Sequence, residues 1–352
     1  MTTATSARPP ASETTSDKVD LNGTLTLLVR QMTWQSEGVM TLVLEDAAGA
    51  DLPQWTPGAH LDLHLPGAIV RQYSLCGDPL DRQRWRVAVL LEQVGRGGSR
   101  AVHRDLRPGM VLTARGPRNN FELRPAGAYR FVAGGIGITP ILAMVNHARD
   151  HGTPWSLLYG GRSRGSMAFV EELPHGDGAG AGAGDGAGGT GGGGGEVTVL
   201  PQDEAGLLPL ADLFADVEPD TLVYACGPGP LLDAIERATA HWPPGSLVLE
   251  RFAPVSAPVP QGLESSFEVE AAASGVTVTV EPGTSIVRAL ESAGVYPETS
   301  CEEGICGTCE TRVLAGTPQH RDSLLSEAER ETGETMMICV SRCAGQRLVL
   351  DL

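Results

Sequence analysis

The sequence predicts a multidomain protein of mixed α/β and β class. We expect a small antiparallel β-barrel, then a parallel α/β domain, then a small C-terminal sheet with a packed helix. Three observations predict this order: a series of short strand-like runs, a stretch where strands alternate with helices, and the cysteine-rich loop SCEEGICGTC at 300–309. A chain of 352 residues is long enough for two or three domains, each with its own core.

Composition excludes several classes of protein. The formal charge of −17 disfavours nucleic acid as a partner, because a phosphate backbone needs a basic face. No apolar run reaches the roughly 18 residues of a membrane helix. The polar residues 1–20 have no apolar secretory segment and are expected to be a disordered tail. Seven unevenly clustered cysteines do not resemble a disulfide framework, so we expect a soluble cytoplasmic protein. We further expect that it binds no membrane and is a monomer.

The barrel is expected over residues 21–125. Its candidate strands are LTLLVRQM, MTLVLED, HLDLHLP, RQYSL, RWRVAVLLEQ and MVLTARGP. They show β-type alternation or short apolar runs, and glycine or proline separates them. Several short strands in so short a segment favour an antiparallel barrel.

The α/β domain is expected over residues 126–252. YRFVAGG, WSLLYGGRS, EVTVLPQ and TLVYACGP are candidate strands, and ITPILAMVNHARDHG and GPLLDAIERATAHW are candidate helices. Strands that alternate with helices imply a parallel sheet with crossover helices. The glycine-rich segment 176–195 cannot bury a core, so we expect a flexible surface insertion there.

The third domain is expected over residues 265–352, after a proline-rich linker at 253–264. SFEVEAAASGVTVTVEPGTSIVRALESAGV predicts a β-hairpin followed by a helix. The cysteine loop comes next, and TMMICVSR and RLVLDL are expected to be the closing strands.

The cysteine loop has the spacing C-x4-C-x2-C, formed by Cys301, Cys306 and Cys309. Followed by one remote cysteine, this is the ligand spacing of plant-type [2Fe–2S] ferredoxins. The glycines of the loop let the backbone bend and bring N–H groups towards the sulfurs. The alternative is a structural zinc site, which usually needs two C-x2-C knuckles, and here only Cys306 and Cys309 form one.

The fourth thiolate is expected to come from Cys339 and not from Cys343, although spacing alone does not choose between them. Cys76 and Cys226 belong to segments assigned to other domains. Cys339 lies in the apolar run TMMICVSR, which is expected to be a strand that fixes its sulfur against the loop. Cys343 precedes Ala-Gly and is expected to be an exposed turn residue with no role.

Four segments in the first two domains could bind a nucleotide-like cofactor, and each is weak evidence alone. RQYSL offers a cation, an aromatic ring and a hydroxyl, and GRGGS could present backbone N–H groups to a phosphate at a helix N-terminus. AGGIGITP leaves a strand and enters a helix, without forming a G-x-G-x-x-G fingerprint. YACGPGPLL places Cys226 at the carboxyl end of a strand, where ligands bind in open α/β sheets. A buried, inert thiol is the alternative for Cys226.

Taken in this order, the segments resemble the ferredoxin–NADP⁺ reductase superfamily. More narrowly, residues 21–352 are similar to the phthalate dioxygenase reductase and vanillate demethylase reductase family. The resemblance implies an antiparallel flavin-binding β-barrel, a parallel α/β nucleotide-binding domain and a C-terminal β-grasp ferredoxin domain. It implies FMN, a [2Fe–2S] cluster and NADH as cofactors, with NADPH as the alternative to NADH. The implied cluster ligands are Cys301, Cys306, Cys309 and Cys339.

The resemblance also implies roles for cofactor-binding residues. The strand RQYSL would hold FMN, GRGGS would contact its phosphate end, GGIGITP would lie where flavin and nicotinamide meet, and CGPGPL would lie beside the nicotinamide. Phe252 would shield the flavin ring, and Arg162 could contact the ribose or pyrophosphate of the nucleotide. Leu90 and Leu91 depart from members that carry basic residues there. The full set is Arg71, Gln72, Tyr73, Ser74, Gly97, Gly98, Ser99, Gly134, Gly135, Gly137, Thr139, Pro140, Arg162, Cys226, Gly227, Pro228 and Phe252.

The resemblance implies an oxidoreductase that passes electrons from NADH through FMN and the cluster to a terminal oxygenase. NADH delivers two electrons as a hydride and a [2Fe–2S] cluster accepts one, so flavin is needed between them. No catalytic acid or base is required. The expected partner is a Rieske non-haem iron oxygenase or demethylase. A reductase serving a cytochrome P450 and a non-catalytic iron–sulfur redox sensor are the alternatives.

Overall fold

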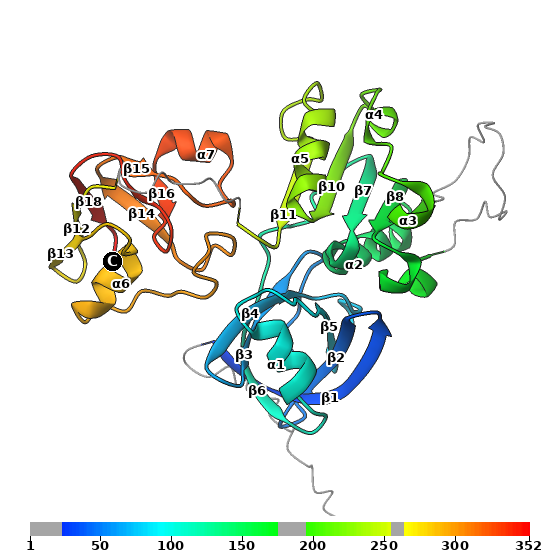
Figure 1. The fold of residues 1–352 in the computed structure, drawn as a ribbon, viewed down its shortest axis with the longest axis horizontal. Helices are drawn as coiled ribbons and strands as arrows, with labels where there is room; N and C mark the ends of the chain where they lie inside the picture. The colour runs from blue at the N-terminus through cyan, green and yellow to red at the C-terminus, as the bar shows by residue number, and fades with distance from the viewer. Residues whose placement is uncertain (1–22, 175–194, 255–263) are drawn as a thin grey trace, which may run out of the picture.

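A computed structural model describes residues 23–174, 195–254 and 264–352. They form three domains in chain order, with the C-terminal domain beside the other two (Figure 1). The expected tail at 1–20, all but the last residue of the glycine-rich insertion, and most of the linker lie outside these residues. The structure confirms the expected fold class, with an antiparallel barrel, a parallel α/β domain and a small C-terminal sheet.

The first domain is a six-stranded antiparallel sheet in the order β4-β3-β6-β1-β2-β5. A bridge between Leu75 and Val87 brings the end of β4 to β5, so the sheet curls towards a barrel. Alternate residues of β1 such as Leu25, Leu27 and Val29 are buried, because successive side chains of a strand point to opposite faces. The strands are β1 (Thr24–Ser36), β2 (Val39–Asp46), β3 (His60–Leu65), β4 (Ile69–Ser74), β5 (Trp85–Leu90) and β6 (Val111–Arg118).

One helix, α1 (Gly98–Asp105), follows the barrel strand β5. Gly97 precedes it with a φ of +89°, a left-handed conformation that a side chain would strain. Ala101 and Val102 face the barrel core, and the polar residues of α1 face outward. This amphipathic pattern fixes which side of α1 faces the barrel.

The second domain is a parallel sheet in the order β11-β10-β7-β8-β9. Helix α2 (Ile138–Asp150) is almost wholly buried and packs on β7, β8 and β10, while α5 (Gly229–Ala238) packs on β10 and β11. The strands are β7 (Ala128–Gly134), β8 (Trp155–Gly161), β9 (Gly195–Pro201), β10 (Thr221–Gly227) and β11 (Leu247–Arg251). Shorter elements are η1 (Gly135–Gly137), η2 (Arg164–Ser166), η3 (Val170–Glu172), α3 (Gln202–Ala205) and α4 (Leu210–Leu213).

Two details of this domain differ from the sequence prediction. Gly195, placed in the glycine-rich insertion, is the first residue of β9. A Cβ on Gly195 would lie 2.0 Å from ring atoms of Trp155, so the close pairing of β8 and β9 needs glycine there. Strand β11 was not predicted, because its short run LVLER shows no clear alternation and every residue in it is half-buried.

The third domain is a five-stranded sheet in the order β13-β12-β18-β14-β16 with α6 packed on it. Strands β12 and β18 are parallel and the other pairs are antiparallel. The elements are β12 (Phe267–Ala271), β13 (Val276–Val280), α6 (Ile286–Ser292), β14 (Glu310–Ala315), β15 (Pro318–Gln319), α7 (Glu327–Thr332), β16 (Thr335–Met337), β17 (Arg342–Cys343) and β18 (Arg347–Leu350).

Helix α7 and strand β14 were not predicted. The sequence does carry a signal for α7, since Ser326 and Glu329 form a reciprocal capping box and Gly333 ends the helix with a φ of +63°. Among the described residues, no helix is long and apolar enough to span a membrane.

Candidate functional site

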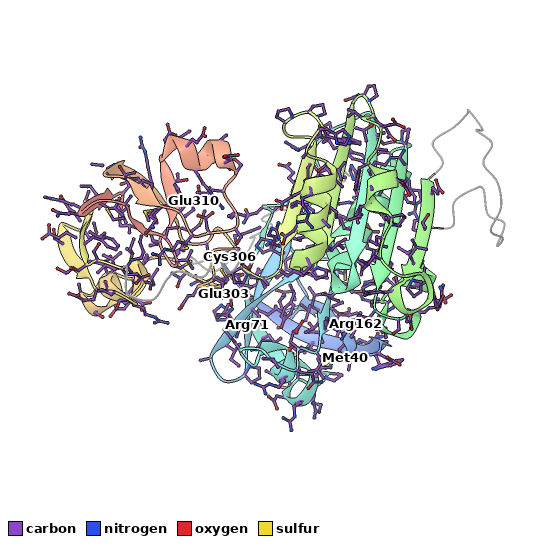
Figure 2. All side chains as sticks on the ribbon, turned by 45° about the horizontal axis from the view of Figure 1, so that its top comes forward. Met40, Arg71, Arg162, Glu303, Cys306 and Glu310 are labelled. Atoms are coloured by element: carbon purple, nitrogen blue, oxygen red, sulfur yellow. The ribbon has the colours of Figure 1, made fainter. Side chains whose placement is uncertain are left out.

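A cleft of about 1560 Å³ lies where the three domains meet. All but two of the predicted cofactor-binding residues line it, although they come from six separate segments of the chain. The exceptions are Pro140, buried in the first turn of α2, and Cys226, whose side chain is fully buried. Figure 2 shows Arg71 on the barrel close to Glu303 and Cys306 of the cysteine loop.

Arg71 on β4 lies against the N-terminus of α1. A Cβ on Gly98 would lie 2.4 Å from Arg71 Cγ, so the glycine lets the arginine pack there. The guanidinium donates to the carbonyl of Val70 at 2.6 Å and to that of Arg96 at 2.9 Å. Helix N-termini present unpaired N–H groups and a partial positive charge. Together the two features make a position for an anion such as a phosphate.

The other residues of the RQYSL strand are held by the barrel. Gln72 Nε2 donates to Asp62 Oδ1 at 2.9 Å, and Arg118 forms an ion pair with Asp62 at 2.6 Å. Burial raises the pKa of Tyr73, so its phenol stays protonated. These interactions fix the wall of the cleft before any ligand binds.

Ser99, the second residue of α1, ties the preceding loop to the helix. Its hydroxyl oxygen accepts a hydrogen bond from the backbone N–H of Glu92 at 3.0 Å. The loop 92–99 is thereby folded back so that Gly97, Gly98 and Ser99 line the cleft.

The two glycine segments of the α/β domain meet at the carboxyl ends of β7 and β10. A Cβ on Gly227 would lie 3.0 Å from the Cα of Gly134, and one on Gly137 would lie 2.2 Å from the carbonyl oxygen of Cys226. Side chains are excluded here because backbones touch. Thr139 is buried and its hydroxyl donates to the carbonyl of Ile136 at 3.0 Å, so it stabilises the turn into α2.

Cys226 contacts Glu250, a cleft residue that the sequence analysis did not single out. The thiol of Cys226 donates to Glu250 Oε2 at 3.8 Å. Burial raises the pKa of Glu250 to about 8 and raises that of Cys226 as well. Both groups therefore hold a proton at neutral pH. Phe252, two residues further on, lines the cleft with 39% of its surface exposed.

His60 on β3 also lines the cleft and was not predicted. Burial, and then the charge of Arg118, lowers the pKa of its imidazole to about 4, so the ring is neutral. Its Nε2 atom is buried without a hydrogen-bond partner in the described part of the chain. An orphaned polar atom in the cleft wall fits a bound polar ligand. A single histidine on a strand gives no signal in the sequence.

The cysteine loop brings four buried sulfurs together. Hydrogen bonds join Cys301 to Cys306, Cys301 to Cys339 and Cys309 to Cys339. Hydrogen bonds from the other two thiols are the main reason that the pKa of Cys301 is lowered. Four convergent thiols match the number of ligands that a [2Fe–2S] cluster needs.

The loop backbone supports this arrangement. Gly304 and Gly307 have φ values of +70° and +74°, and a Cβ on Gly304 would lie 2.6 Å from Val340. The N–H of Glu303 points at Cys301 Sγ at 3.3 Å, and the Thr308 hydroxyl lies 3.2 Å from Cys306 Sγ. Donors aimed at sulfur stabilise thiolate, the form that binds iron.

Two reasons given for choosing Cys339 were wrong. The strand β16 ends at Met337, and Cys339 lies in the turn after it. Cys343 was expected to be exposed in a turn, yet it is buried in the two-residue strand β17. Its sulfur accepts a hydrogen bond from the N–H of Gly345 at 3.2 Å, on the core side of the domain. A turn carries Cys339 to the loop, and pairing with β15 turns Cys343 away.

Comparison with known proteins agrees with this geometry. Residues 269–344 match the family described as 2Fe-2S iron-sulfur cluster binding domain. The chain is 39% identical over 331 residues to the phenoxybenzoate dioxygenase subunit beta of Ectopseudomonas oleovorans, with 93% of this chain and 97% of that protein covered.

Two solved structures are also similar. A phthalate dioxygenase reductase, described as modular for electron transfer from pyridine nucleotides to [2Fe–2S], has a TM-score of 0.67 at 32% identity, covering 94% of this chain and 98% of that one. An intact type IV self-sufficient cytochrome P450 monooxygenase has a TM-score of 0.81 at 39% identity. The match covers 98% of this chain and 43% of that one, so this chain spans less than half of its length.

The fold and the cleft define an oxidoreductase that combines a flavin- and nicotinamide-binding reductase with a [2Fe–2S] domain. The chain belongs to the phthalate dioxygenase reductase and vanillate demethylase reductase family.

Proposed function

We propose that this protein takes electrons from NADH, passes them through FMN and its [2Fe–2S] cluster, and delivers them to the terminal component of a Rieske non-haem iron oxygenase. The observation that supports this most strongly is the single cleft, which the flavin segments, the nicotinamide segments and Cys301 line together. Flavin supplies the change from a two-electron donor to a one-electron acceptor.

The residues present fit FMN. Arg71 and the N-terminus of α1 would hold its terminal phosphate, and β4 would hold the ring through Gln72, Tyr73 and Ser74. The unpaired Nε2 of His60 offers a further polar contact. Phe252 would cover the ring on the side of the nicotinamide and exclude water from it. The sequence has no separate adenosine-binding segment, which favours FMN over FAD.

The nicotinamide would lie against Gly134, Gly227 and Pro228, where the absence of side chains lets the ring approach the flavin. Arg162 at the end of β8 would contact the ribose or pyrophosphate. The acidic residues Asp203 and Glu204 follow β9 at the same edge of the sheet. Glu204 forms an ion pair with Arg164 at 3.5 Å, so Asp203 is the carboxylate that would repel a 2′-phosphate and support NADH over NADPH.

Cys301, Cys306, Cys309 and Cys339 would ligate the two irons of the cluster. The seven free cysteines of the structure suit a reducing compartment, which supports a cytoplasmic location. We also propose that the protein is a monomer, which size-exclusion chromatography with light scattering tests.

A terminal oxygenase as partner is supported by similarity to the phenoxybenzoate dioxygenase subunit and to phthalate dioxygenase reductase. The second candidate is a cytochrome P450, because the self-sufficient P450 monooxygenase contains a part with a TM-score of 0.81 to this chain. Anaerobic mixing of the NADH-reduced protein with each purified class of acceptor distinguishes them. Rapid reduction of the haem and not of a Rieske centre would contradict the Rieske assignment.

Chemical analysis tests the cofactors. Acid extraction should release FMN, and metal analysis should find two irons for each flavin. Extracted FAD, or zinc without iron, would contradict the proposal. Steady-state kcat/KM should be higher for NADH than for NADPH. NADH-dependent reduction of cytochrome c should be observed, and its absence in protein that holds both cofactors would favour the redox-sensor alternative.

A further inference from the structure

The C-terminal domain touches the barrel through the cysteine loop itself. In Figure 2 the loop residues Glu303 and Cys306 lie on the side of that domain that faces Arg71 of the barrel. Two barrel side chains, Arg96 and Asn120, bond to the main chain of this loop. The carbonyl groups that they bond to belong to cluster cysteines.

Arg96 makes two contacts with the loop. Its Nη1 donates to the carbonyl of Cys301 at 3.0 Å, and its Nη2 forms an ion pair with Glu303 at 2.6 Å. The carbonyl of Arg96 accepts a hydrogen bond from Arg71, the residue proposed to hold the FMN phosphate. The same short loop therefore contacts the flavin site through its main chain and the cluster loop through its side chain.

Asn120 makes the second attachment. It follows the end of β6, and its Nδ2 donates to the carbonyl of Cys306 at 2.7 Å. Gly307, the next residue of the loop, is close enough that a Cβ on it would lie 2.9 Å from the same nitrogen. The two carbonyl acceptors, on Cys301 and Cys306, belong to the cysteines of one thiol pair.

These attachments are polar and partly open to solvent. The side chains of Arg96 and Glu303 are 47% and 29% exposed. An ion pair with this exposure contributes little, and salt screens it. Polar contacts of this kind between domains allow the domains to separate and dock again.

We propose that Arg96 and Asn120 are positioning residues that dock the cluster loop reversibly on the flavin barrel. They hold the cluster where it receives electrons from the flavin. The inference rests on the proposed function. Each docking event moves one electron, so the two electrons of one NADH need two successive transfers, with the external acceptor oxidising the cluster in between.

The test compares Arg96→Ala, Arg96→Lys, Asn120→Ala and Asn120→Asp in the full-length holoenzyme. Arg84→Ala is the matched control, because Arg84 forms an exposed ion pair with Glu45 at 3.1 Å within the barrel. Stopped-flow measurement follows flavin reduction by NADH and then cluster reduction by the flavin. Iron content and the cluster midpoint potential are measured for each variant.

Arg96→Ala should leave flavin reduction and ferricyanide reduction unchanged and slow flavin-to-cluster transfer about tenfold, because it removes the charged hydrogen bond to the Cys301 carbonyl. The transfer rate of Arg96→Lys should lie between those of wild type and Arg96→Ala, since lysine keeps the charge but not the fork of donors. Asn120→Asp should slow transfer more than Asn120→Ala, because a carboxylate faces the Cys306 carbonyl. The midpoint potential and iron content should stay unchanged.

The salt dependence of flavin-to-cluster transfer tests the docking in the wild-type protein as well. Raising the ionic strength from about 0.01 M to about 0.5 M should slow flavin-to-cluster transfer in wild type and much less in Arg96→Ala. The inference is overturned if transfer is insensitive to salt, if all four variants transfer at the wild-type rate, or if Arg84→Ala slows it equally. Wild-type protein that lacks flavin or iron would instead refute the proposed function.

Discussion

Gly137 requires glycine because of a close approach to β10 and not because of its own backbone conformation. Its φ of −61° and ψ of −7° are helical, so alanine adopts this backbone without strain. A Cβ there would nevertheless lie 2.2 Å from the carbonyl oxygen and 2.4 Å from the carbonyl carbon of Cys226. Both are backbone atoms of β10 and cannot rotate away. Gly137→Ala must therefore push the start of α2 away from the sheet.

The expected cost follows from this overlap. Overpacking of a tight site lowers the free energy of unfolding by up to about 3 kcal/mol. Replacing glycine by alanine in helical backbone raises it by about 0.5 to 1 kcal/mol. The net loss of about 2 kcal/mol corresponds to a fall in Tm of the α/β domain by roughly 4 to 8 °C. The displaced turn also lines the cleft, so the KM for NADH should rise.

Scanning calorimetry measures the loss, and hydrogen exchange over α2 and β10 assigns it to this domain. Gly229→Ala is the control, because a Cβ at the first residue of α5 would meet no heavy atom of the described residues within 4 Å. It should be neutral or slightly stabilising. An equal Tm for Gly137→Ala and wild type, with unchanged hydrogen exchange in β10, would refute the steric reasoning.

Three further predictions test the cleft and the cluster. Cys339→Ser should lose iron and cytochrome c reduction, while NADH–ferricyanide reduction survives. Cys343→Ser should keep its iron and both reductase activities, because Gly345 can donate to the serine oxygen. The reverse result for the two variants would make the ligand assignment wrong. Burial raises the pKa of Glu250 to about 8, so the folded state binds its proton more tightly and stability should fall as pH rises from the usual glutamate pKa to about 8. Glu250→Gln should flatten this dependence in urea unfolding, and an unchanged profile would contradict it. Arg71→Ala should weaken FMN binding by about tenfold or more in equilibrium dialysis, since it removes a charged hydrogen-bond donor; full retention of FMN would count against the phosphate site.

The local pattern of the sequence was enough for the order of the domains and for most strands and helices. Period-two runs such as LTLLVRQM specify half-buried strands, because alternate side chains of a strand point to opposite faces. The spacing of Cys301, Cys306 and Cys309 specifies a cluster loop, because thiolate ligation needs those residues on one bent segment. Where the pattern was weak, as in LVLER of β11, the element was missed.

The tertiary structure decided which distant groups meet. Turn and strand geometry brings Cys339 to the loop and places Cys343, whose spacing is also plausible, in the core. Packing between segments far apart in the chain joins Cys226 to Glu250, Arg71 to Gly98, and Asn120 to Cys306. Residue spacing determines which side chains share a face of one element. Contacts between elements depend instead on how sheets, helices and domains pack, because that packing minimises the exposed apolar surface of the whole chain.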